Sequence, residues 1–286
     1  MMNKEFEKLS IQANEGDFNY DSDEIYEQQN EGLKKLLNAL GSILLTFSII
    51  DSKLSLRSDE KAKIKKQLST ITIKSFKNQI DLEKKLIYDI LYESIKSNYY
   101  KKMYILSLGT KIDIKKLDDK VIKPIINDVV EGKNWTLRNS INKNNLRNML
   151  IKDMDNFSKG LISVNDIKDI VEKRYRTNAY VTDRLIDNEI ARCQFKINDY
   201  FANEYGIKKQ RFSAVLDLKT TDKCRSLNGK VFKVNDPNKP RIPQDTHINC
   251  RSCYINIPSR NWKLKDINED SVWKNYSKWY QENIGD

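Results

Sequence analysis

The chain has 286 residues and a formal net charge of +11, which is enough for about two domains of ordinary size. Apolar residues make up 39% and charged residues 32%, with only nine glycines and five prolines, which excludes collagen-like, low-complexity and wholly disordered proteins. The longest apolar run, residues 36–50, is interrupted by polar residues and is shorter than the roughly 20 residues of a membrane-spanning helix. The first residues are acidic and lack the apolar segment of a signal peptide. We therefore expect a globular, largely helical protein with a cytoplasmic start and no membrane association.

Charge is distributed unevenly along the chain. Residues 1–30 hold two lysines and eight acidic residues, a net charge of −6, so residues 31–286 carry +17. A basic body of this kind would attract polyanions such as nucleic acid, or an acidic protein surface. An AT-rich genome would also fill solvated helix faces with lysine, and the many Asn and Ile residues agree with that explanation. Net charge alone leaves both explanations open.

Apolar spacing predicts long amphipathic helices in the first half of the chain. Residues 1–30 show little periodicity, and we expect a flexible acidic arm there. From Gly32 to Phe47 apolar residues recur every three or four positions, and a second long helix is expected from Ser58. Two or more antiparallel helices would bury these apolar stripes. This predicts a helical bundle in residues 31–134.

Further helices are predicted in residues 135–206. One helix is expected over about 135–157, with Gly160 as its stop, and another over about 178–205, with Gly206 as its stop. Both glycines can adopt the left-handed conformation that commonly ends a helix.

The hydrophobic period changes from helical to alternating after Gly206. Residues 211–217 alternate, Asn228-Gly229 is a strong hairpin signal, and residues 253–257 form a third β-like run. These features predict a small β-containing module over residues 207–258.

Residues 259–286 are rich in aromatic residues, and a helical tail is expected at least over 270–281. Its Trp262, Trp273 and Trp279 lack an evident core of their own, which favours docking to a partner. The predicted fold is thus mainly α: an N-terminal helical bundle with long amphipathic helices, a small β-containing Cys/His module, and a helical C-terminal tail.

The only histidine of the chain is close in sequence to two of its four cysteines. Cys224, His247, Cys250 and Cys253 are separated by 22, two and two residues. Three thiolates and one imidazole are a suitable tetrahedral set for a structural Zn²⁺, which would stabilise so small a module. Packing and hydrogen bonding could instead hold Cys224, His247 and Cys250 together without metal. A catalytic zinc is disfavoured, because no H-E-x-x-H or H-x-E motif supplies a general base.

A longer motif surrounds these residues. An Asp, a Thr-x-x-Cys, an Asn-Gly-Lys turn and a His-x-Asn-Cys-Arg string follow in order over residues 216–252. This order resembles the C-terminal signature of phage head morphogenesis proteins, the family typified by the F protein of phage Mu, and the resemblance extends over residues 135–258. The motif residues are Asp217, Thr221, Asn228, Gly229, Lys230, Asn249 and Arg251, with Glu189 upstream.

The chain departs from the family pattern at several positions. Thr221 stands where many members have a cysteine, and Asp187 and Asn188 replace an Arg-Thr pair. Glu189 has two interpretations, a functional carboxylate or an ion pair with Arg192 three residues on.

The resemblance implies a non-enzymatic minor capsid protein that associates with the portal protein and other procapsid components, and with double-stranded DNA. Such a protein is expected in the virion, at the portal vertex of the head, and in the cytoplasm of the bacterial host during assembly. No glycine-rich nucleotide loop, Ser-His-Asp set or acidic metal pair is evident, so we predict no catalytic residues. A nuclease or toxin fused to this module would need a catalytic set in residues 1–134, where none is recognisable.

The alternative function is a free, sequence-independent nucleic-acid-binding protein. Lys and Arg would meet phosphates, and neighbouring tyrosines could stack on bases. Lysine-rich helix faces are also common without any ligand. The residues concerned are Lys61, Lys63, Lys65, Lys66, Lys101, Lys102, Lys173, Arg174 and Arg176.

Overall fold

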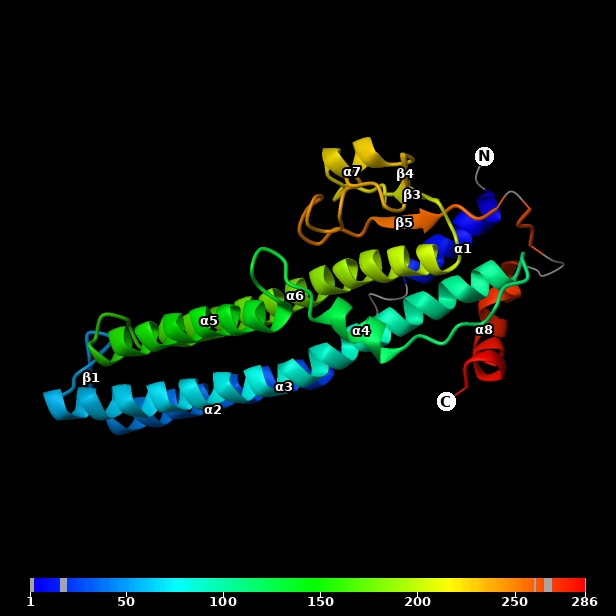
Figure 1. Ribbon diagram of the computed structural model, residues 1–286. Helices are drawn as coiled ribbons and strands as arrows, with labels where there is room; N and C mark the ends of the chain where they lie inside the picture. Colours follow the sequence, from blue (N-terminus) through cyan, green and yellow to red (C-terminus); the bar gives the residue numbers. More distant parts are fainter. Residues whose placement is uncertain (1–2, 16–19, 260, 265–268, 286) are drawn as a thin grey trace. The chain divides into compact units, whose positions relative to one another are not determined.

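The computed structural model describes residues 3–15, 20–259, 261–264 and 269–285, and helices dominate it as predicted (Figure 1). The chain divides into two compact units, each built from separate stretches of sequence. Two long helices, α3 (Ser58–Ser107) and α6 (Ile167–Glu204), contribute residues to both units. Unit 1 comprises Met1–Tyr20, Asp89–Asp128 and Ile186–Asp286, and unit 2 comprises Asp21–Tyr88 and Val129–Leu185. Two of the boundaries between the units, at residues 88/89 and 185/186, therefore fall inside α3 and α6.

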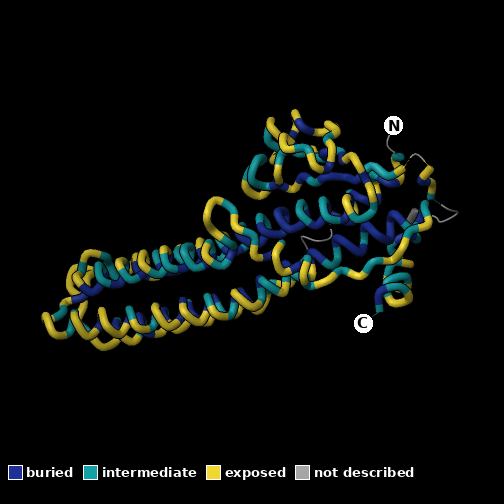
Figure 2. Tube along the Cα trace, viewed as in Figure 1, coloured by how far each residue is buried: buried dark blue, intermediate teal, exposed yellow. Residues whose placement is uncertain are grey.

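Unit 2 is a helical bundle with one apolar core. Helices α2 (Asp23–Thr46) and α5 (Trp135–Ser158) run alongside the unit 2 parts of α3 and α6 (Figure 1). A short hairpin, β1 (Ile49–Ile50) and β2 (Lys53–Leu54), joins α2 to α3. The helix faces that point away from the apolar core are exposed (Figure 2). The core includes Leu36, Leu40, Leu68, Phe76, Leu150, Phe157 and Val171.

Local signals fix the ends of the bundle helices. Asn134 caps α5 by accepting the Leu137 N–H at 3.0 Å, and Gly160 follows the helix with a φ of +72°. Helix α6 runs from Ile167 to Glu204, so the segment before residue 178 and the helix predicted after it form one continuous helix. Gly206, with a φ of +66°, ends α6 as expected.

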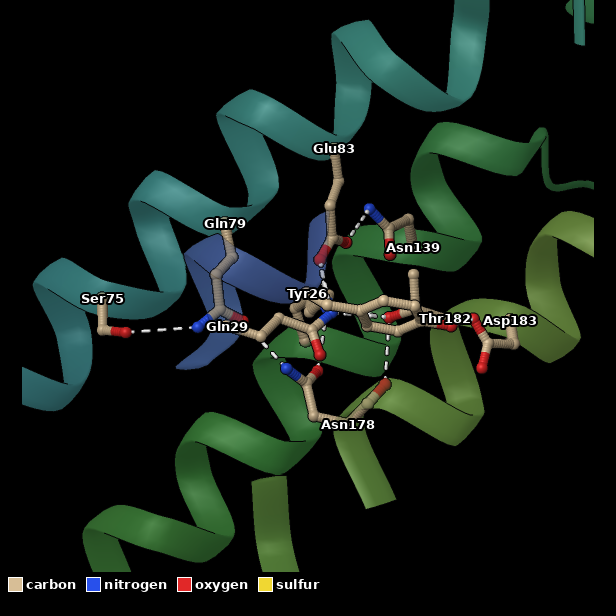
Figure 3. Close-up of polar contacts among 10 residues, drawn as sticks. Tyr26, Gln29, Ser75, Gln79, Glu83, Asn139, Asn178, Thr182 and Asp183 are labelled. Atoms are coloured by element: carbon tan, nitrogen blue, oxygen red, sulfur yellow. Dashed lines mark hydrogen bonds and ion pairs between the residues drawn. The ribbon is translucent and has the colours of Figure 1, made fainter. Parts of the chain in front are cut away.

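A layer of buried polar side chains crosses the unit 2 bundle (Figure 3). The Lys143 ammonium lies 2.5 Å from a carboxylate oxygen of Glu83, and both side chains are 1% exposed. Asn139 and Gln29 donate hydrogen bonds to the same carboxylate, at 3.0 and 2.9 Å. Burial lowers the pKa of Lys143, and the Glu83 carboxylate opposes that shift. The layer joins α2, α3, α5 and α6. The buried charges of Glu83 and Lys143 are therefore compensated by each other and by polar side chains around them.

Unit 1 contains a three-stranded antiparallel sheet in the order β4-β3-β5, formed by β3 (Lys209–Ser213), β4 (Val231–Lys233) and β5 (Cys253–Asn256). The sheet lies along the C-terminal half of α6 (Figure 1), where Asn198 bonds to Asn256 and Phe195 packs on Tyr254. The β-containing module predicted from the sequence is therefore present.

The predicted hairpin at Asn228-Gly229 was wrong. The residues before it form helix α7 (Asp222–Leu227), which Asn228 ends, and Gly229, with a φ of +80°, leads into β4. A positive φ serves a helix C-terminus as well as a hairpin turn, so the dipeptide alone did not distinguish the two.

The acidic N-terminal segment is also different from the expected flexible arm. Residues Lys4–Glu15 form helix α1, in which Phe6, Leu9 and Ala13 are buried. Glu7 forms an ion pair with Arg211 on β3. The helical spacing of these apolar residues was hidden by the acidic composition. Residues 16–19 of the predicted arm lie outside the described part of the chain.

The C-terminal segment packs onto its own unit. Trp262 is 2% exposed, and its Nε1 donates to the carbonyl oxygen of Leu106 at 3.1 Å. In helix α8 (Glu269–Asn283), Trp273 and Trp279 pack their rings around Tyr104 of α3. Helix α4 (Asp119–Ile126) completes the described helices of unit 1. None of the helices in the described ranges is long and apolar enough to span a membrane.

Candidate metal centre

Cys224, His247 and Cys250 converge in unit 1. Their possible ligand atoms all lie within 4.8 Å of one another, and the two sulfur atoms are 3.7 Å apart. Cys224 comes from helix α7, while His247 and Cys250 belong to residues 243–252, which we call the Cys/His loop. The cysteines of the chain are free thiols. Residues distant in sequence are thus brought to one point.

The residues fit a metal ion by chemistry as well as by position. Cys224 and Cys250 are 0% and 1% exposed, and His247 is partly exposed. The Nδ1 of His247 lies 2.8 Å from the carbonyl oxygen of Ile248, so a proton on Nδ1 donates there and leaves the Nε2 lone pair free. Burial raises the pKa of Cys250, whereas a bound metal would keep the thiolate deprotonated. This Cys-His-Cys group could hold a metal ion.

Cys253, the fourth predicted ligand, is not part of this group. It lies on β5 opposite Ser213, and burial raises its pKa to about 11. The next residue, Tyr254, packs in the same apolar cluster as Cys224 and Cys250. Because successive strand residues point to opposite faces, the Cys253 side chain is directed away from that cluster.

Helix α7 is held in place by motif residues. Thr221 is its N-cap and accepts the Cys224 N–H at 3.4 Å. Asp217 forms an ion pair of 2.5 Å with Arg251 of the Cys/His loop, and this contact lowers the pKa of the Asp217 carboxyl. Arg225 of α7 donates to the carbonyl oxygen of Asp217 at 2.6 Å. The Thr-x-x-Cys and Cys-Arg parts of the motif are therefore fastened to each other around the thiols.

The Asn-Gly-Lys part of the motif connects α7 to the sheet. Asn228 Oδ1 accepts the Ala214 N–H at 3.0 Å. The Gly229 N–H donates to the carbonyl oxygen of Phe212, and the Phe212 N–H donates to that of Lys230, both at 2.9 Å. The Lys230 side chain is exposed, and Lys230 contributes to this connection through its backbone carbonyl oxygen.

Two family positions upstream lie on α6. Asn188 and Asn249 exchange hydrogen bonds, which joins the Cys/His loop to the helix. Glu189 is buried and lies 2.6 Å from Arg192, which also donates to the carbonyl oxygens of Ile125 and Ile126 at the end of α4. The ion-pair interpretation of Glu189 therefore agrees with the geometry. Asn188 was noticed in the sequence only as a departure from the family pattern.

The basic patches do not all offer free charges. Lys102 is 5% exposed and donates to Asn98 at 2.6 Å, so its assignment as a nucleic-acid contact is corrected. Lys65 pairs with Asp155, Arg174 with Asp153 and, at 3.9 Å, Arg176 with Glu172. The exposed residues of these basic patches include Lys63, Lys66 and Lys173, while Lys61 and Lys101 are half-buried.

A cavity of about 880 Å³ adjoins the Cys-His-Cys group. His247, Cys250 and Cys253 line it, whereas Cys224 does not. Leu216 and Ile248 also line it and are 60% and 65% exposed. Two of the three converging residues therefore border this cavity, although Cys250 itself is almost fully buried.

Comparison with known proteins agrees with the motif. Residues 135–255 match the family model described as phage Mu protein F like protein. Residues 135–255 are a Mu F-like region. This confirms the family seen in the sequence, over somewhat less than half of the 286 residues. No curated protein and no solved structure matches the chain significantly.

The Mu F-like region begins and ends at structural landmarks. Its first residue, Trp135, is the first residue of α5 and is 1% exposed, and Arg138 donates to the carbonyl oxygen of Lys133 at 2.6 Å. Its end lies in β5, just beyond the Cys/His loop. The region thus includes all three residues of the Cys-His-Cys group.

Proposed function

We propose that this chain is a non-enzymatic minor capsid protein of a phage or prophage, which acts in procapsid assembly at the portal vertex. The Mu F-like region carries the proposal. The motif geometry supports a structural role, because Asp217, Asn249 and Arg251 all engage in contacts that hold the Cys/His loop. The protein would then be a virion component that is made and assembled in the host cytoplasm.

The Cys-His-Cys group is proposed to hold a structural Zn²⁺. Thiolate and imidazole are the ligands that zinc prefers, and the sheet of this module has only three short strands. A metal would supply cross-linking energy where the apolar core is small. The motif contacts of Asp217 and Asn249 would hold the Cys/His loop ready for the ion.

Contact with packaged DNA is proposed at a second cavity of unit 1, of about 820 Å³. Lys111, Lys115, Lys208 and Lys209 line it, and Lys115 is paired with Glu204. Lys209 also lies opposite Lys233 in the β3–β4 register, and both are exposed. Like charges directly opposite each other destabilise a sheet, so a bound polyanion would relieve their repulsion.

The assembly proposal is tested with the full chain. Co-expression with the portal protein of the same phage element should give a complex that survives purification, and a portal protein from an unrelated element is the control. Deleting residues 1–30 or 260–286 would be ambiguous, because α1 and Trp262 belong to the packed structure of unit 1. Failure to associate with portal, procapsid or virion would reject the assembly role.

The DNA proposal is tested by affinity for duplexes of scrambled sequence. Binding should be independent of sequence and should fall steeply with salt, since it rests on phosphate contacts. Exchanging Lys208 and Lys209 for Gln should weaken binding and reduce its salt dependence, whereas exchanging Lys63 and Lys66 for Gln is the matched control. If the exchange of Lys63 and Lys66 weakens binding and that of Lys208 and Lys209 does not, the basic patches of α3 and the alternative of a free nucleic-acid-binding protein are favoured.

A further inference from the structure

The Cys-His-Cys group provides three ligands where a closed structural zinc site has four. Within the described ranges, no further Cys, His, Asp or Glu joins the group. The chain contains no second histidine. Cys193 is fully buried beside Arg192 on α6, and its pKa is raised to about 11 by that burial. A fourth ligand must then come either from a rearrangement of this chain or from outside it.

Cys253 is the nearest protein donor in sequence, but its strand holds it back. It is paired with Ser213 in the β3–β5 register, and the pairs on the same ladder continue to Gln210 and Asn256. Turning the Cys253 side chain toward Cys250 would require reversing the face of a strand whose Tyr254 and Ile255 are buried. A one-residue slip of this kind would bring Tyr254 out of the apolar cluster.

The cavity offers space beside two of the three residues of the group. His247 and Cys250 line the cavity of about 880 Å³ together with Cys253, whereas Cys224 does not line it. The volume is far larger than a water molecule, which occupies about 30 Å³ of liquid. A small donor could therefore reach an ion held by the three residues.

We propose that the metal of this site has three protein ligands, Cys224, His247 and Cys250, and an exchangeable fourth position open to the cavity. Water fills this position in the isolated protein, and a monodentate nitrogen donor such as imidazole replaces it. The inference rests on the proposed metal site and deepens it, because an open position makes the ion accessible to an external ligand rather than sealed in the fold.

Cobalt(II) substitution tests the proposal, because its visible spectrum reports the number and type of ligands. The full chain is loaded with Co²⁺, and imidazole and azide are titrated in as probes. We expect one Co²⁺ per chain, thiolate charge-transfer bands, and a saturable change of the visible bands with imidazole. Cys253→Ser and Cys193→Ser should leave the spectrum unchanged, whereas Cys224→Ser should abolish the thiolate spectrum of the site.

The possible outcomes distinguish a closed fourth position from the absence of a metal site. A spectrum altered by Cys253→Ser, or bands insensitive to both probes, would overturn the open position while leaving the metal site intact. No Co²⁺ or Zn²⁺ uptake by the wild-type chain would reject the metal itself. If a variant fails to fold, as judged by circular dichroism, the titration of the wild-type chain still decides whether the fourth position is exchangeable.

Discussion

Asn188 of α6 and Asn249 of the Cys/His loop form a reciprocal pair. The Oδ1 of Asn188 accepts the backbone N–H of Asn249 at 2.9 Å, and its amide donates to the Oδ1 of Asn249 at 3.1 Å. Asn249 has a φ of +60°, a conformation that Asn tolerates better than most residues. The pair therefore fixes the loop between His247 and Cys250 while the backbone makes an unusual turn.

Substitutions at Asn249 separate the contribution of its side-chain hydrogen bond from that of its positive φ. Asn249→Ala should destabilise the module by about 1–2 kcal/mol, because it loses the side-chain hydrogen bond and replaces Asn by a residue that tolerates positive φ less well. Asn249→Gly loses the same hydrogen bond without the conformational cost, so its loss should be smaller by about 1 kcal/mol. Urea unfolding of both variants measures the difference. Equal stability of the Ala and Gly variants would contradict the assigned strain.

The buried pair of Glu83 and Lys143 gives a second prediction. Glu83→Gln or Lys143→Met alone should destabilise unit 2 by about 3–5 kcal/mol, because each leaves one buried charge without its partner. Exchanging both residues for Met should cost less than the sum of the single changes. Glu31→Gln, which breaks the exposed pair of Glu31 and Lys35 in the same bundle, is the control and should change stability by less than about 1 kcal/mol. Additive effects in a double-mutant cycle would show that the pair is not coupled.

Metal affinity should depend on pH. Burial raises the pKa of Cys250, so its thiol is protonated in the metal-free protein near neutral pH and must lose that proton when the ion binds. Affinity should therefore rise with pH, by up to about tenfold per pH unit where the Cys250 thiol releases its proton. Competition with a chromophoric chelator at several pH values measures this, and a flat profile would argue against Cys250 as a thiolate ligand.

The contact between Asp217 and Arg251 predicts a different response to acid. The hydrogen bond from Arg251 lowers the pKa of Asp217, so its stabilising effect is complete above the ordinary pKa of about 3.9 and is lost as pH falls through the lowered value. Asp217→Asn should therefore be less stable than wild type at neutral pH, and the two should converge in strong acid. Asp113→Asn, which removes an exposed carboxylate of the same unit, is the control. A difference that persists unchanged in acid would exclude the ion pair as its cause.

Much of the helical fold followed from sequence periodicity, but the tertiary assignments did not. Residues 135–158 and the stops at Gly160 and Gly206 were accessible because apolar spacing and glycine conformation are local properties. The packing of α1 was missed, since its acidic residues dominated the composition while Phe6 and Leu9 supplied the buried face.

The candidate site was predictable in part for a similar reason. The motif itself contains Cys224, His247 and Cys250, so the sequence was enough to predict these three residues as candidate ligands. The role of Asn188 depends on a contact with a residue 61 positions away, which no local pattern reveals. The exclusion of Cys253 depends on the register of β5, and spacing alone placed it with the other thiols.

Gly109 provides the last prediction, because a side chain there would meet Trp262. A Cβ at Gly109 would lie 2.5 Å from the indole ring, so Gly109→Ala must displace Trp262 or the backbone around it. We expect a red-shifted tryptophan emission and faster proteolysis of residues 261–285. Gly41→Ala is the matched control, because nothing lies within 4 Å of its Cβ and the exchange should stabilise α2 by about 0.5–1 kcal/mol.

The same variant distinguishes two roles of the aromatic tail in assembly. If Trp262 only completes the core of unit 1, Gly109→Ala should loosen the tail without strengthening capture of the portal protein. If the tail is a docking element that must leave its own unit, the loosened variant should bind portal more strongly, because less free energy is needed to release Trp262. Loss of portal binding together with an undisturbed tryptophan emission would contradict both, since the substitution would then have acted without moving the indole ring.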